Sequence, residues 1–144
     1  MTNSRPNDED VLNLLADARN ALRCSYSPYS KFPVGAALRT KSGRIFTGTN
    51  VENASYGLTI CAERVAIFKA VSEGEKTISA IAVVSSDGKP CPPCGACRQV
   101  ISEFSDPTTV VVTDAENGIA LIKIGELLPS AFGGSELERF KSIS

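Results

Sequence analysis

An unbroken apolar run from Ala80 to Val84 constrains the fold more than any other feature of the sequence. A strand with one solvated face alternates apolar and polar residues, whereas a continuous apolar run of strand length is typical of a strand covered on both faces. In α/β proteins helices supply that cover. We therefore expect a sheet that lies between two layers of helices.

Other segments supply candidate strands and a first helix. Acidic and capping residues at 7–10 precede an apolar stripe with helical spacing, which predicts an amphipathic helix. Segments 34–38 and 45–49 flank Lys41-Ser42-Gly43, a hairpin signal, and 109–113 and 119–122 are two further β-rich runs. The stripe consists of Val11, Leu14, Leu15, Ala18 and Leu22.

Two more helices and a short helical tail complete the prediction. Residues 61–71 are apolar on nearly every side, which predicts a buried helix. A second helix is expected at 97–104, after a loop at 85–93, and short helical pieces from Gly125 onward. The resulting fold class is α/β, a three-layer α/β/α sandwich around one mixed five-stranded sheet, in a single domain over residues 1–144.

Composition narrows the possible partners. The chain has 144 residues, with 15 basic against 16 acidic side chains spread along it, so the clustered basic footprint of a nucleic-acid binder is absent. No apolar run is long enough to cross a bilayer, and the first ten residues are polar and acidic. We expect a cytoplasmic protein without a nucleic-acid or membrane partner.

The cysteines indicate a metal site. The chain has five cysteines and no histidine, so a general base must be another residue type. Cys61, Cys94 and Cys97 are predicted at helix starts, where the helix N-terminus lowers the pKa of a thiol. Three thiolates favour zinc and leave one tetrahedral position for water, which is typical of a catalytic site.

Glu63 is the candidate proton carrier. It follows Cys61 by two positions, and within a regular helix these side chains would diverge by roughly 200°. The pairing works only if Cys61 caps the helix. Glu63 would then take a proton from zinc-activated water and hand it to the substrate. Arg64 and Arg98 are candidates to offset the charge of the thiolates.

These motifs resemble the small homotetrameric zinc-dependent cytidine deaminase family. The resemblance rests on Asn50-Val51-Glu52-Asn53-Ala54-Ser55-Tyr56-Gly57, Cys61-Ala62-Glu63-Arg64 and Pro93-Cys94-Gly95-Ala96-Cys97-Arg98, and it extends from Ser30 to Phe132. It implies hydrolytic deamination of cytidine and 2′-deoxycytidine to uridine and 2′-deoxyuridine with release of ammonia, in pyrimidine salvage. One Zn²⁺ per subunit and a homotetramer are implied with it.

The resemblance also implies roles for individual residues. Cys61, Cys94 and Cys97 would bind zinc, Glu63 would be the acid and base, and Arg64 would neutralise the thiolates. The implied substrate-binding residues are Phe32 at the pyrimidine, Asn50 and Glu52 at the ribose, Ala62 through its backbone, Tyr56 near the sugar across a subunit boundary, and Phe132 in a neighbouring site. This chain has Gly134 where the family often has proline.

Other functions are weighed against this one. Cys91-Pro92-Pro93-Cys94 after a buried strand resembles a thiol redox pair, but a redox site leaves Glu63 without a role. A structural zinc site needs a fourth ligand, and only Cys91 is near enough in sequence. A deaminase of nucleoside-like antibiotics has less use for the ribose pair Asn50 and Glu52. A polynucleotide-editing deaminase would need a basic groove, which the sequence does not show. A non-enzymatic zinc module has no use for Glu63 on a buried helix.

Overall fold

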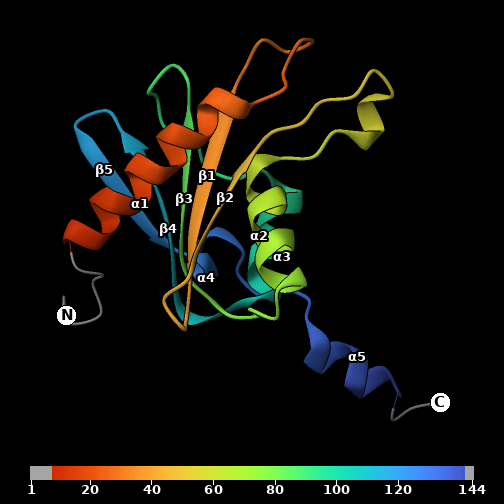
Figure 1. Ribbon diagram of the computed structural model, residues 1–144. Coiled ribbons are helices and arrows are strands. Elements are labelled where there is room, and N and C mark those ends of the chain that lie inside the picture. Colours follow the sequence, from red (N-terminus) through yellow and green to blue (C-terminus); the bar gives the residue numbers. More distant parts are fainter. Residues whose placement is uncertain (1–7, 142–144) are drawn as a thin grey trace.

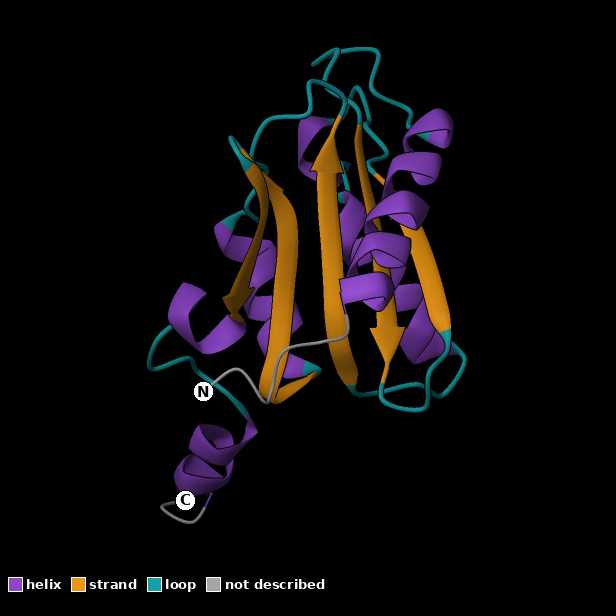
Figure 2. Ribbon diagram, turned by 90° about the vertical axis from the view of Figure 1, so that its left-hand side faces the viewer, coloured by secondary structure: helices purple, strands orange, loops and turns teal. Residues whose placement is uncertain are grey.

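The computed structural model describes residues 8–141, which form one mixed five-stranded sheet with helices on both faces (Figures 1 and 2). The three-layer α/β/α prediction is therefore confirmed. Helices are α1 (Asp8–Ala21), α2 (Ala62–Ser72), α3 (Gly95–Glu103), α4 (Ile124–Leu127) and α5 (Gly134–Lys141), with 3₁₀ turns η2 (Leu22–Cys24) and η3 (Tyr56–Leu58). Strands are β1 (Val34–Thr40), β2 (Ile45–Thr49), β3 (Ile78–Ser85), β4 (Ser105–Ala115) and β5 (Gly118–Lys123).

The sheet has the order β2-β1-β3-β4-β5. Only β3 and β4 are parallel, and the connection between them contains α3, as a parallel crossover requires. The other neighbours are antiparallel, with Ala37 opposite Ala82 between β1 and β3. Because β3 is central, its two faces are both covered, which explains the apolar run at 80–84.

Alternate residues of β3 supply two separate cores. Ala80, Ala82 and Val84 pack in the cluster that contains α1, whereas Ile81 and Val83 pack in the cluster that contains α2, α3 and α4. The α1 stripe is buried as predicted at Val11, Leu14, Leu15 and Ala18. Each face of the strand therefore faces its own helical layer, in agreement with the two-residue period of strands.

Some sequence predictions of helix burial and of element bounds were wrong in detail. The prediction that α2 is buried on nearly every side fails at Phe68, whose side chain is 48% exposed, because the sheet covers only one side of this helix within the chain. Helix α3 begins at Gly95, two residues before the predicted start. Strand β4 is longer than the predicted run, so only two residues separate it from β5.

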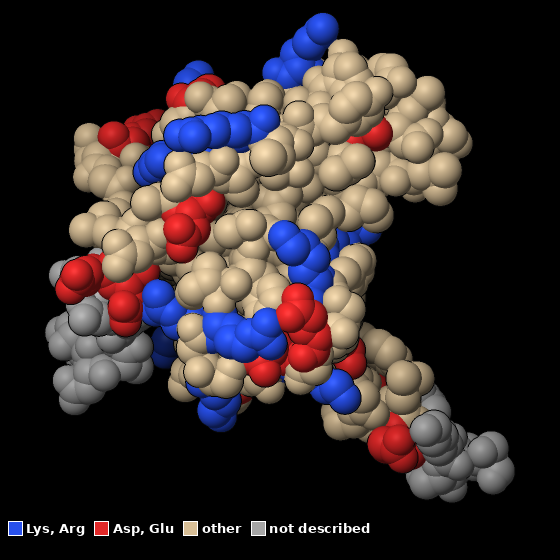
Figure 3. Space-filling view, in the orientation of Figure 1, with Lys and Arg blue, Asp and Glu red and all other residues tan. Residues whose placement is uncertain are grey.

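The loops at one end of the sheet and the tail at the other define the outline of the molecule. In Figure 1 the loops at 25–33 and 50–61 rise together at the upper right, while α5 extends away from the body at the lower right. On the face in Figure 3 acidic and basic side chains are interspersed, and the upper right part carries few charges. Among the described residues, no helix is long and apolar enough to cross a membrane.

Candidate metal centre and active site

The metal-binding candidates come from the starts of two neighbouring helices. Cys61 is the N-cap of α2 and Cys94 is the N-cap of α3, and Cys97 lies in the first turn of α3. Neither N-cap side chain bonds to the helix backbone, so both sulfurs remain available. The fold thus brings together three thiols, although Cys61 and Cys97 are 36 residues apart in the sequence. Cys97 is buried and Cys94 is exposed.

The spacing of the three sulfurs fits a tetrahedral metal. The Sγ atoms of Cys61, Cys94 and Cys97 all lie within 4.8 Å of one another, and those of Cys61 and Cys94 are 4.0 Å apart. Two thiolates on one zinc, each with a bond of about 2.3 Å, are separated by roughly 3.8 Å in a tetrahedron. In the part of the chain that the structure describes, this is the only such cluster of potential ligands. Cys91 is not part of it, so these ligands leave the fourth position open.

The protonation of the thiols also fits a metal site. The neighbouring Cys97 thiol and, after it, Arg64 lower the pKa of Cys61 to about 5, against the opposing effect of burial. The hydrogen bond with Cys61 and burial raise the pKa of Cys97. These opposite shifts describe a proton shared between the thiols of Cys61 and Cys97, and binding of a metal by both sulfurs would displace it.

Arg64 is the cation nearest to this cluster. Its Nη2 donates to Cys61 Sγ at 3.4 Å, and its Nε is buried without a hydrogen-bond partner among the described residues. The contact with Cys61 raises the pKa of the Arg64 guanidinium. The unsatisfied Nε–H of this cation can stabilise additional negative charge nearby, and such charge appears when the cysteine thiols lose their protons. Arg98, the other predicted cation, instead donates to the carbonyl oxygens of Pro93 and Leu127.

Glu63 lies in the first turn of α2, beside the cysteine cluster, and it is only 4% exposed. Burial, more than any other effect, raises the pKa of its carboxyl group, and the negative charge of Cys61 adds to this. A carboxyl group with a raised pKa can both accept and donate a proton near neutral pH. The cap position of Cys61 is what lets these two side chains share one site.

A close approach between β2 and α2 holds this helix in place. Gly48 of β2 lies so near the first turn of α2 that a Cβ at this position would be 2.5 Å from the Ala62 carbonyl oxygen. Ala62 itself is fully buried. Only glycine allows the two backbones to come this close, so the sequence of β2 decides where Glu63 lies.

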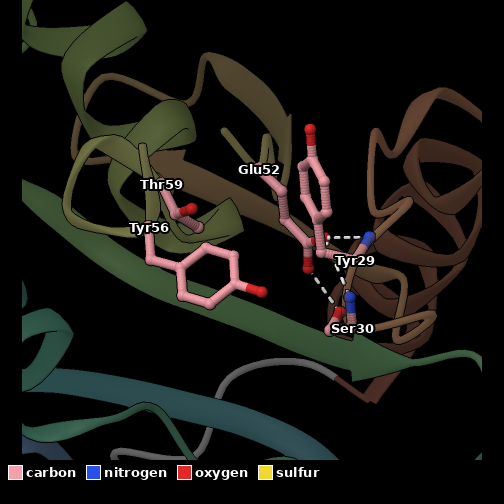
Figure 4. A pocket seen from close by; sticks show the side chains of 5 residues that line it. All are labelled: Tyr29, Ser30, Glu52, Tyr56 and Thr59. Carbon is pink, nitrogen blue, oxygen red and sulfur yellow. Dashed lines mark hydrogen bonds between the residues drawn. The ribbon is translucent and has the colours of Figure 1, made fainter. Parts of the chain in front are cut away.

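A hollow lies beside the predicted ribose residues (Figure 4). It has a volume of about 370 Å³, and its lining residues are Tyr29, Ser30, Glu52, Tyr56 and Thr59. Glu52 Oε1 accepts from the backbone N–H groups of Tyr29 and Ser30 at 2.9 and 3.1 Å, and Oε2 accepts from Ser30 Oγ. These bonds, with the Ser30 hydroxyl first, lower the pKa of Glu52.

Asn50 bonds to the same loop from the end of β2. Its Oδ1 accepts from the Val34 N–H at 3.0 Å and from Ser25 Oγ at 2.5 Å, and its Nδ2 donates to the Phe32 carbonyl oxygen at 2.8 Å. The amide therefore fixes the backbone around Phe32, and one of its N–H groups has capacity left. Asn50 is buried, whereas the Phe32 ring is 43% exposed.

The sequence did not single out every residue of the hollow. Tyr29 and Thr59 take part in none of the sequence predictions, and Ser30 enters only as the first residue of the family resemblance. They line the hollow with Glu52 through tertiary contacts, which no local pattern contains. Among the predicted residues, Tyr56 and Phe132 are 76% and 51% exposed. Phe132 is not a lining residue of this hollow, and Gly134 begins α5.

The redox alternative is not supported by Cys91. Burial raises the pKa of this thiol to about 11, whereas a reactive redox cysteine needs a lowered pKa. Its backbone N–H donates to Thr113 Oγ1, and its side chain packs against the core. Cys91 and Cys94 are both free thiols.

Three thiolates that leave one position open, on helix starts above a mixed sheet, define a zinc-dependent enzyme of the deaminase type. Comparison with known proteins identifies the family. The sequence pattern of the cytidine and deoxycytidylate deaminase zinc-binding region matches residues 8–113, so the chain belongs to this family. The family resemblance, the enzyme class and zinc as its metal are thereby confirmed.

Similar proteins cover nearly the whole chain. Cytidine deaminase of Halalkalibacterium halodurans is 50% identical over 125 residues, which are 86% of this chain and 95% of the relative. That of Sporosarcina psychrophila is 47% identical over 129 residues, 89% of this chain and 95% of the relative. The crystal structure of cytidine deaminase from Burkholderia pseudomallei is 48% identical, with a TM-score of 0.79, and the match covers 84% of this chain and 98% of that one.

Proposed function

We propose that the protein catalyses the hydrolytic deamination of cytidine and 2′-deoxycytidine to uridine and 2′-deoxyuridine, with release of ammonia, as a step of pyrimidine salvage. The observation that carries this proposal is a buried carboxyl group, Glu63, in the first turn of the helix that starts at Cys61. The names of the similar proteins support cytidine as the substrate.

Cys61, Cys94 and Cys97 are the residues that would hold the zinc. When bound, zinc supplies a Lewis acid that makes water acidic enough to act as a nucleophile at neutral pH. The backbone of α2 and α3 fixes the three sulfurs, and Arg64 offsets their negative charge through its contact with Cys61. This contact supports neutralisation as the role of Arg64.

Glu63 would move the protons of the reaction. It accepts the two protons of the attacking water in turn, and it passes one to the pyrimidine ring and the other to the departing amino group. The C4–O bond forms and the C4–N bond breaks, so that cytidine and water give the uridine product and ammonia. The raised pKa of the carboxyl group suits both directions of transfer, and such catalysis contributes roughly 10²–10⁴ in rate.

The nucleoside would lie between the cysteine cluster and the hollow of Figure 4. Asn50 and Glu52 would bind the ribose hydroxyls, for which Asn50 keeps one N–H and Glu52 keeps acceptor capacity. Phe32 would border the pyrimidine, and the backbone of Ala62 would contact the base. Glu52 on the wall of the hollow is the observation that supports a polar sugar site.

A homotetramer would complete this site with aromatic residues of neighbouring subunits. Tyr56 would lie near the sugar across a subunit boundary, and Phe132 would pack on the base in a neighbouring subunit. Their exposure within the single chain, together with that of Phe68, supports an apolar interface. A cytoplasmic location stays a prediction from the sequence.

The test combines bound metal with turnover. Purified wild type should contain one zinc per chain and remove the ultraviolet band of cytidine, and Glu63→Gln should keep the zinc and lose turnover by at least about 10²-fold. Glu103→Gln, an exposed carboxylate on α3, is the matched control and should behave as wild type. Unchanged turnover in Glu63→Gln would refute the role of Glu63, and a wild type that leaves cytidine intact would refute the proposed function.

A further inference from the structure

The segment between α4 and α5 is held at both ends by neighbouring side chains of α3. Arg98 Nη1 donates to the Leu127 carbonyl oxygen at 3.1 Å, and Gln99 Nε2 donates to the Phe132 carbonyl oxygen at 2.9 Å. Arg98 and Gln99 are both half-buried residues, and the bond from Arg98 is partly buried whereas the bond from Gln99 is exposed. The two hydrogen bonds therefore span the whole segment from Leu127 to Phe132.

The backbone inside this segment adopts a conformation that it would not choose by itself. Ser130 has a φ of 55°, in the left-handed region that residues other than glycine rarely occupy. Such a conformation persists where the surrounding structure determines it. The contacts from Arg98 and Gln99 lie on either side of Ser130, so they help to hold this turn.

The same helix also carries metal ligands. Cys94 is the N-cap of α3 and Cys97 is in its first turn, and Arg98 Nε donates to the Pro93 carbonyl oxygen at 2.8 Å. The position of the segment between α4 and α5 is therefore tied, through α3, to the positions of Cys94 and Cys97. Because Phe132 is 51% exposed, packing within the chain covers only part of it, and the position of its backbone contributes to the direction of the ring.

We infer that Gln99 is a positioning residue for the deamination reaction. Its side-chain amide holds the Phe132 carbonyl group and thereby sets where the Phe132 ring is presented to the pyrimidine of the substrate. This inference rests on the proposed function, in which Phe132 packs on the base. Gln99 is not a lining residue of the hollow in Figure 4, and its side-chain amide bonds to the Phe132 backbone, so we expect its effect to pass through Phe132.

Steady-state kinetics with cytidine tests this dependence. Gln99→Leu should raise KM about three- to tenfold, the effect expected for one lost hydrogen bond, with kcat within about twofold of wild type. In a Phe132→Ala background the same substitution should change KM by less than about twofold, since residues that act through one another are not additive. Gln99→Glu, which keeps the shape but loses the donor, should reproduce the effect of Gln99→Leu.

The matched control is Glu103→Leu, one helical turn further along α3, where the side chain is exposed. It should leave KM unchanged. An unchanged KM in both Gln99 variants, or an equal KM increase with and without Phe132, would overturn the inference. A wild type that does not convert cytidine would instead refute the proposed function.

A second measurement does not need activity. The sequence contains no tryptophan, so Phe132→Trp introduces a single tryptophan, whose fluorescence can be excited apart from that of the tyrosines, into the segment between α4 and α5. Adding Gln99→Leu should lower its fluorescence anisotropy and increase its quenching by acrylamide, whereas adding Glu103→Leu should change neither. Equal anisotropy and quenching in all three proteins would overturn the role of Gln99 in holding the tail.

Discussion

Replacing Gly48 with alanine should damage the active site through the packing of β2 against α2. The added Cβ would lie 2.5 Å from the Ala62 carbonyl oxygen and 2.6 Å from the Ala66 nitrogen. Since ordinary contact distances are about 3.5 Å, the first turn of α2 must move outward by roughly 1 Å. Glu63 and the capping Cys61 lie in this turn and must move with it.

A displacement of this size has consequences for both rate and stability. A misplacement of about 1 Å can cost on the order of 10²-fold in rate. Overpacking costs about 1–3 kcal/mol in the free energy of unfolding, and a loss of about 2 kcal/mol lowers Tm by roughly 4–8 °C in a chain of this size. The assay is kcat for cytidine, bound zinc and Tm on the same Gly48→Ala preparation.

Gly35→Ala provides the matched comparison on the other face of the sheet. Its Cβ would lie only 2.1 Å from the Ala18 carbonyl oxygen of α1, so its Tm should fall by at least as much. Because α1 carries none of the proposed site residues, the folded protein should keep its zinc and kcat. Gly125→Ala, which meets nothing within 4 Å, should be silent. A Gly48→Ala protein with wild-type kcat and zinc would refute the reasoning.

Four further substitutions test the site and its surroundings. Arg64→Gln should raise the pKa of the Cys61 thiol and weaken zinc binding about 10–100-fold. In a competition with a chelator, the pH at which half of the protein holds zinc should shift upward. An unchanged pH of half-occupancy would contradict this. Cys91→Ser should keep zinc and activity whereas Cys97→Ser should lose both, and the reverse would favour redox chemistry. Burial raises the pKa of the Cys91 thiol to about 11, so the folded state favours the protonated thiol. The free energy of unfolding should therefore fall as pH rises from about 9 towards 11. Denaturant unfolding should show a smaller fall in Cys91→Ser. Asp114→Asn should break the paired bonds from Arg19, which measure 2.7 and 3.1 Å. A cost of about 1.5 kcal/mol in the free energy of unfolding should lower Tm by roughly 3–6 °C without changing kcat. An unchanged Tm would show that this pair does not contribute to stability.

The sequence alone determined the layers of the fold and the three cysteines that are the candidate metal ligands. The apolar run at 80–84 predicts a doubly covered strand, and the spacing of Val11, Leu14, Leu15 and Ala18 predicts the helix that covers one face. Such patterns are readable because the period of a helix or strand is a local property. The positions of the cysteines at helix starts are local in the same sense.

Only the tertiary structure decided how distant segments meet. Strand order, the parallel pairing of β3 with β4, and the contact of Gly48 with Ala62 depend on pairings that no local pattern contains. The same applies to the bonds of Gln99 with the tail and of Glu52 with its loop. Burial decides the rest: Glu63 has a raised pKa and Phe68 is exposed because of what packs around each, and a residue's neighbours in space are set by the whole fold.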